Sequence, residues 1–165
     1  LGEIMLDVAA LASLDDLLQV VRDDRAHERE HSLEVQLPFL QTLLGSFTLV
    51  PLVVGDASAE AVAQVLELLW GGEETLIVIS SDLSHYLTYA QAQAVDHATA
   101  QRILSLDSGL TPDDACGAAA INGALQAARR RGLTPRLLDL RNSGDTAGDR
   151  DRVVGYGAFA FEALH

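Results

Sequence analysis

The densest group of reactive side chains in this sequence is the run SSDLSHY at residues 80–86. It follows TLIVIS at residues 75–80, an apolar run typical of a buried strand, so the polar residues are expected at the strand's carboxyl end. Asp82 precedes His85 by three residues, and a carboxylate at that spacing can orient an imidazole or share a proton with it, as a general acid or base requires. The alternative is that Asp82 caps a turn and His85 is structural. Residue types alone leave both open.

A second candidate is Cys116, the only cysteine of the chain. Asp113 or Asp114 can cap a helix predicted over residues 113–131, which places Cys116 in or near its first turn, where the helix dipole favours a thiolate. A thiolate can ligate a metal or act as a nucleophile. The residues alone favour a simpler explanation, a small apolar side chain in a tightly packed helix rich in alanine and glycine. Without a second cysteine, a CxxC metal site and an internal disulfide are both excluded.

A third candidate, HEREH at residues 27–31, matches the H-E-x-x-H pattern of zinc peptidases. That site requires His27 and His31 on one face of a helix, Glu28 as general base and a third ligand downstream. The preceding segment, VRDDRA, is charged almost throughout, and the pattern fixes only three positions. These features favour a solvated helix start with one functional histidine. A zinc peptidase is the less favoured alternative.

The elements that must position these residues alternate between helices and strands. Apolar residues at helical spacing predict helices over residues 9–21, 33–44, 58–70, 89–106 and 113–131. Short apolar, β-branched runs predict strands over residues 48–55, 75–80, 135–140 and 152–161. Asn142 and Asp145, between the last two strands, are expected to be turn residues. This order predicts an α/β fold, a mostly parallel sheet with helices on both faces, and ligands at the carboxyl ends of its strands.

Composition bounds the class of protein. The 165 residues suit a single domain over residues 1–165. A formal net charge of -13 argues against nucleic acid as a partner, because neutralising phosphates requires clustered Lys and Arg. The longest apolar runs are too short to span a membrane. A single cysteine fits a reducing compartment, so the expected location is cytoplasmic.

Five segments, taken together, resemble the Memo-like family, whose bacterial and archaeal members are called AmmeMemoRadiSam system protein B. These segments are EHSLEVQLPFLQ (residues 30–41), VPLVVG (50–55), LIVISSDLSHY (76–86), ACG (115–117) and VVGYGAFAF (153–161). They occur in order over nearly the whole chain. By this resemblance HEREH is the lead-in to the EHSLE segment, and its match to the zinc peptidase pattern is accidental.

The resemblance implies a fold similar to the class III extradiol dioxygenases, which are non-haem iron enzymes. It implies that Cys116 stands at a metal-ligand position, that His85 and Asp82 stand where the pocket keeps an acid/base histidine and a carboxylate, and that His31 lines the same pocket. The metal expected is divalent iron, although a mixed Cys/His set also suits zinc or copper. The implied activity is metal-dependent oxidation of an unknown small molecule. The alternative is a non-catalytic module that binds a peptide or protein in the same cleft.

The chain also departs from the family pattern. The family's amino-terminal third carries a His-Ala-Gly and a Gly-Pro-Ser-His motif whose histidines complete the metal site, and neither motif occurs in this sequence. The opening LGEIMLD resembles the stretch that follows that third. The expectation is therefore a domain truncated at its N-terminus, with an exposed sheet edge that favours self-association.

Overall fold

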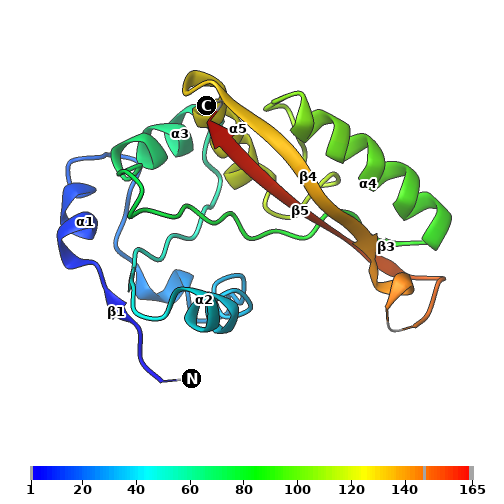
Figure 1. Cartoon of the computed structure of the whole chain (residues 1–165), viewed down its shortest axis with the longest axis horizontal. Coiled ribbons are helices and arrows are strands. Elements are labelled where there is room, and N and C mark those ends of the chain that lie inside the picture. The colour runs from blue at the N-terminus through cyan, green and yellow to red at the C-terminus, as the bar shows by residue number, and fades with distance from the viewer. Residues whose placement is uncertain (1, 147, 164–165) are drawn as a thin grey trace.

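The computed structural model of the chain describes residues 2–146 and 148–163. Figure 1 shows the arrangement of its helices and strands. In chain order these are β1 (Met5–Leu6), α1 (Val8–Ser13), the 3₁₀ helix η1 (Asp24–Ala26), α2 (Leu37–Leu44), β2 (Thr48–Leu49), α3 (Ala59–Leu68), β3 (His85–Leu87), α4 (Tyr89–Leu104), α5 (Ala118–Arg130), β4 (Leu133–Asn142), the 3₁₀ helix η2 (Ser143–Asp145) and β5 (Val153–Ala163). The predicted α/β class is confirmed.

The largest sheet is antiparallel, whereas the sequence predicted a mostly parallel one. Its strand order is β3-β5-β4, and β4 and β5 form the long hairpin at the centre of Figure 1. Only residues 143–152 connect the two long strands, and a parallel crossover needs about a dozen residues or more. The one parallel pair among the described residues is β1 with β2, where Met5 lies beside Thr48 and Leu6 beside Leu49.

Residues 75–80, predicted as a buried strand, lie outside the hydrogen-bonded strands of the described chain. Their side chains still alternate as in a strand: Ile77 and Ile79 pack against the core between α3 and α5, whereas Leu76 is 61% and Val78 is 43% exposed. Helices thus cover one side of this segment, and the prediction of helices on both faces does not hold here. The prediction of a buried strand is therefore wrong, because an apolar run does not show that the segment lacks a paired neighbour and is covered on one side only.

Two apolar clusters join the helices to one another and to the hairpin. In the first, α3 packs closely on α5, and a Cβ added at Gly123 would lie 2.3 Å from a methyl carbon of Val62. In the second, Phe159 and Phe161 of β5 pack against buried residues of α4, α5 and the segment between them. The buried members of the second cluster are Ile103, Leu110, Ala118 and Leu125. This cluster therefore fixes the start of α5 relative to β5.

Two predicted helices are shorter than their apolar spacing suggests. The helix predicted over residues 9–21 ends at Ser13, and Leu18 beyond it is 100% exposed. Packing supplies most helical stability, and only part of this apolar face packs, because Leu14 is 2% exposed whereas Val21 is 80% exposed. The helix predicted from Asp113 begins at Ala118, because Asp114 instead accepts hydrogen bonds from Thr111. No helix among the described residues is long and apolar enough to cross a bilayer.

Leu125→Ala tests the cluster that joins α4, α5 and β5. Leu125 is 0% exposed, so we expect the truncation to leave a cavity and lower the free energy of unfolding by about 2–5 kcal/mol. Leu18→Ala is the matched control, and because Leu18 is 100% exposed its loss should stay below about 0.5 kcal/mol. Urea unfolding followed by circular dichroism measures both. Equal losses would show that this cluster does not organise the fold.

The predicted self-association can be tested at residues 75–80, where Leu76 and Val78 are exposed and the backbone is not paired with another strand of the described structure. Exposed strand-like backbone flanked by apolar side chains favours pairing with another chain, and a lysine at such an edge opposes it. We expect concentration-dependent dimers or larger species in light scattering, reduced by Val78→Lys. Leu18→Lys places the same charge at an exposed leucine away from this edge and should change nothing. A monomer at high protein concentration would contradict the prediction.

Candidate functional site

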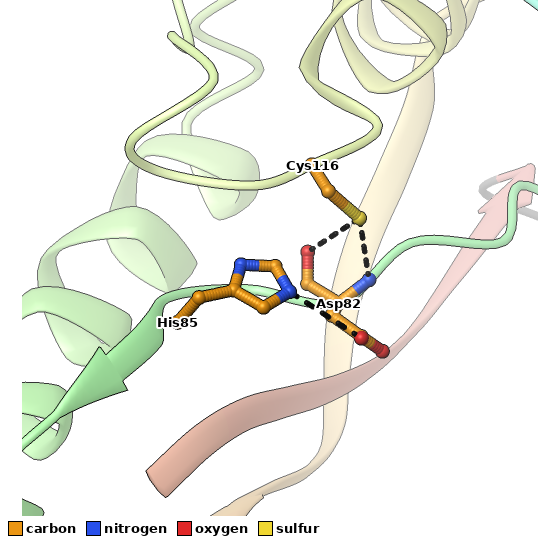
Figure 2. Close-up of side chains that lie close together, drawn as sticks. All are labelled: Asp82, His85 and Cys116. Carbon is orange, nitrogen blue, oxygen red and sulfur yellow. Dashed lines mark hydrogen bonds and ion pairs between the residues drawn. The ribbon is translucent and has the colours of Figure 1, made fainter. Parts of the chain in front are cut away.

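Asp82, His85 and Cys116 come together at one place in the structure. Each offers one possible metal-ligating atom, and these three atoms all lie within 4.8 Å of one another. Figure 2 shows the imidazole beside the Asp82 carboxylate and the sulfur next to the Asp82 backbone. The two sequence candidates, SSDLSHY and Cys116, form one site. They are joined by a hydrogen bond from the Asp82 amide to the Cys116 sulfur, and these two residues are 34 positions apart in the sequence.

Backbone pairing with β5 positions the Asp82–His85 segment. The Leu83 amide donates to the Gly155 carbonyl at 2.8 Å, and the Gly155 amide donates to the Ser84 carbonyl at 2.8 Å. β3 then begins at His85, but its register against β5 shifts before Leu87. Tyr86 at this irregularity has φ +58°, a left-handed conformation that is costly for a residue with a large side chain. Such a bulge bends a strand and redirects its side chains.

A close contact with Ser81 positions the cysteine. The Gly117 amide donates to the Ser81 hydroxyl oxygen at 2.9 Å, and the Cys116 amide donates to the Asp82 carbonyl at 3.3 Å. A Cβ added at Gly117 would lie 2.8 Å from the Ser81 Cβ, closer than real Cβ atoms approach. Glycine therefore lets the chain before α5 reach the end of residues 75–80, and Cys116 lies directly before the helix N-cap at Gly117, as the sequence indicated.

The Cys116 sulfur lies against the backbone of Asp82. The Asp82 amide donates to it at 3.3 Å, and the Ser81 hydroxyl oxygen, which donates to the Asp82 carbonyl, is 3.5 Å away. These contacts fix the position of the sulfur beside the Asp82 residue. The side chain is nevertheless exposed. The alternative of a cysteine packed as a small apolar core residue is therefore wrong.

The His85 and Asp82 side chains are close without being tightly bonded. His85 Nε2 lies 3.5 Å from Asp82 Oδ2, and the side chains are 32% and 46% exposed. That distance exceeds an ordinary hydrogen bond, and an ion pair this exposed stabilises little. Ligand atoms on one tetrahedral metal ion lie roughly 3.3 to 3.8 Å apart, given metal–ligand bonds of about 2.0–2.3 Å. The His85–Asp82 separation already falls in that range.

The loop before Cys116 is anchored to α4 by charge. The Arg102 guanidinium contacts Asp107 at 2.8 Å and Asp114 at 2.9 Å. Burial acts to raise the pKa of Asp114, but hydrogen bonds from Thr111 and the nearby positive charge of Arg102 outweigh it and hold the pKa below its usual value. Asp114 is therefore charged at neutral pH and ties this loop to α4.

Tyr156 on β5 is a site neighbour that the sequence reasoning missed. Burial raises the pKa of its phenol, and the negative charge of Asp82 raises it further. The phenol therefore stays protonated at neutral pH and can donate a hydrogen bond near the site. Its only signal in the sequence is the GYG at residues 155–157, where flanking glycines suggested a close approach by a ligand or another backbone.

The EHSLE segment lies outside the group formed by Asp82, His85 and Cys116. His31 is exposed, and its role in lining the pocket stays a prediction. Five residues further on, the Gln36 side chain donates to the Ser80 hydroxyl at 3.1 Å. Residues 27–31 form turns and coil rather than a helix, so the helical face that a zinc peptidase requires is not formed. Asn142 and Asp145 cap η2, which confirms them as turn residues.

The sequence is similar to one protein family over nearly its whole length. The profile of a family described as Memo-like protein matches residues 1–160. A MEMO1 family protein of Archaeoglobus fulgidus is 32% identical over 98% of this chain. Another from Sulfolobus acidocaldarius is 37% identical over 94% of the chain. MEMO1 family protein Ta0237 of Thermoplasma acidophilum is 36% identical over 94% of the chain. The resemblance predicted from the five segments is confirmed.

The alignments leave part of each relative uncovered. This chain spans 66% of the Archaeoglobus protein, 60% of the Sulfolobus protein and 62% of the Thermoplasma protein. The similarity therefore concerns about two thirds of the length of each relative.

Gly117→Ala tests the close contact that positions the cysteine. The added methyl group must displace Ser81 or the chain at Cys116, so we expect a loss of about 1–3 kcal/mol in the free energy of unfolding. Gly117 has φ -90°, which alanine adopts freely, so backbone strain does not complicate the result. Gly55→Ala is the matched control, because nothing lies within 4 Å of a Cβ there. If both variants unfold at the same urea concentration, the contact at Gly117 is not tight.

Proposed function

Because the chain belongs to the Memo-like protein family, we propose that it functions as a metal-dependent oxidoreductase whose site contains Asp82, His85 and Cys116. The observation that carries the proposal is the convergence of one carboxylate, one imidazole and one thiol within 4.8 Å. This proposal includes a fold related to the class III extradiol dioxygenases and divalent iron as the metal.

The donor set fits a transition metal. Thiolate and imidazole ligands suit iron, zinc and copper, whereas magnesium and calcium prefer oxygen ligands only. With Cys116 as its ligand and His85 and Asp82 left for proton transfer, the ion would keep open coordination positions, as catalytic rather than structural metal sites do. The exposure of Cys116, and of nearly half of the Asp82 side chain, leaves room for a small molecule beside the metal.

Each of the three residues has a defined part in the proposal. Cys116 would hold the metal through its sulfur, which the Asp82 amide and the Ser81 hydroxyl group keep in place. Bound iron would supply the redox chemistry, with dioxygen as the oxidant of an organic substrate. His85 would accept a proton and return it, and the Asp82 carboxylate, 3.5 Å from His85 Nε2, would orient the imidazole.

A metal titration of the full chain tests the proposal. Anaerobic calorimetry with Fe(II), then with Zn(II), is expected to give one bound ion per chain and at least about 100-fold weaker binding for Cys116→Ala, because a direct ligand matters more than the outer groups whose loss costs 10–100-fold. His97→Ala removes an exposed histidine outside the site and should bind normally. His31→Ala tests in the same way whether His31 belongs to the pocket.

Two further variants separate metal binding from proton transfer. If His85 and Asp82 handle protons, His85→Ala and Asp82→Asn will bind metal within a few-fold of the unchanged chain yet lose oxygen uptake with an active substrate. If they are ligands, both variants will lose affinity. A non-catalytic binding module would show changes in partner affinity alone and no oxygen uptake. An unchanged chain that binds neither ion, or Cys116→Ala that binds both normally, would refute the metal site.

A further inference from the structure

A buried carboxylate lies directly behind the site. Asp96, on α4, is 2% exposed, and its Oδ1 accepts a hydrogen bond from the Ser84 amide at 3.0 Å. Ser84 precedes His85 in the sequence and is itself 1% exposed. Asp96 is thus a side chain from another element that fixes the peptide between the Asp82 and His85 side chains.

The Asp96 carboxyl group also packs directly on β5. A Cβ added at Gly155 would lie within 2.1 to 2.5 Å of all three atoms of that carboxyl group. Gly155 is the residue whose backbone pairs with Leu83 and Ser84. The absence of a side chain at Gly155 is what allows α4, β5 and the site segment to meet at one point.

Removing the carboxylate would release only one of several hydrogen bonds that hold this segment. The two backbone bonds to Gly155 would remain, while the buried Ser84 amide would lose its acceptor. A buried amide without a partner is costly, so the segment is expected to move toward solvent or water. Because Asp82 and His85 flank this peptide, such a movement would change the separation of their side chains.

We propose that Asp96 is a positioning residue that sets the spacing of Asp82 and His85 through the Ser84 amide. The inference rests on the proposed metal site for its functional meaning, but the hydrogen bond itself can be tested without metal. Outer groups that orient metal ligands typically change metal affinity by 10–100-fold when they are removed. Asp96 would act in that way through the backbone rather than through direct contact with a ligand side chain.

The first test compares Asp96→Ala, Asp96→Asn and Ile103→Ala in a Co(II) titration of the full chain. Asparagine keeps an acceptor oxygen, so Asp96→Asn should bind Co(II) within about threefold of the unchanged chain, whereas Asp96→Ala should bind at least about 10-fold more weakly and change the visible absorption of the bound ion. Ile103, on the same helix and 2% exposed, controls for lost stability, and Ile103→Ala should keep both affinity and spectrum.

The second test uses hydrogen exchange of the Ser84 amide, read by nuclear magnetic resonance without metal. Exchange should become at least about 10-fold faster in Asp96→Ala but not in Asp96→Asn or Ile103→Ala. Unchanged exchange in Asp96→Ala would overturn the inference whether or not the chain binds metal. Faster exchange with unchanged Co(II) affinity would also overturn it, because the bond would then be structural only. If the unchanged chain binds no Co(II), the metal site fails, and the exchange result alone decides whether Asp96 fixes the segment.

Discussion

The site depends on the pairing of one short segment with β5. Leu83 and Ser84 exchange two backbone hydrogen bonds with Gly155, and the pairing continues where β3 lies beside β5. The bonds hold Asp82 at the end of the extended residues 75–80 and place His85 at the first position of β3. No strand in the described structure is paired ahead of Asp82, so this pairing and the hydrogen bonds between Asp82 and Cys116 hold the carboxylate and the imidazole in place.

Close approaches at glycine bring the remaining parts to this segment. At Gly117 the chain before α5 touches Ser81, and at Gly155 the Asp96 carboxyl group rests on the strand backbone. At both positions a Cβ would overlap atoms already in place, so each glycine is explained by a neighbour rather than by an unusual backbone angle. The site therefore needs three elements, β5, α4 and the start of α5, to meet at distances that only glycine permits.

The sequence identified residues that come together better than it predicted their surroundings. Local spacing singled out SSDLSHY and placed Cys116 near a helix start, because both features depend on neighbours in sequence. Tyr156 and Asp96 were missed, because their effects act across the fold. Strand pairing was also missed: residues 75–80 were predicted as a parallel strand and are unpaired, and β4 and β5 are antiparallel where a mostly parallel sheet was predicted, since an apolar pattern does not show which strand lies alongside. Asp114 was predicted as a helix cap but serves as a charged anchor to Arg102, a choice between two acceptor roles that local sequence could not decide.

The two halves of the site are already joined by the protein itself. The Cys116 amide donates to the Asp82 carbonyl, and the Asp82 amide donates to the Cys116 sulfur, so the backbone holds the thiol beside the carboxylate. In small zinc domains, by contrast, metal binding supplies the energy that folds the ligands together. When the segments that carry a site are already held together by backbone hydrogen bonds, little rearrangement is needed to bind an ion. Little binding free energy is then lost in ordering these segments. These bonds act on the backbone, so they place the thiol beside Asp82 while the Asp82 and His85 side chains, 46% and 32% exposed, keep room to adjust to a ligand.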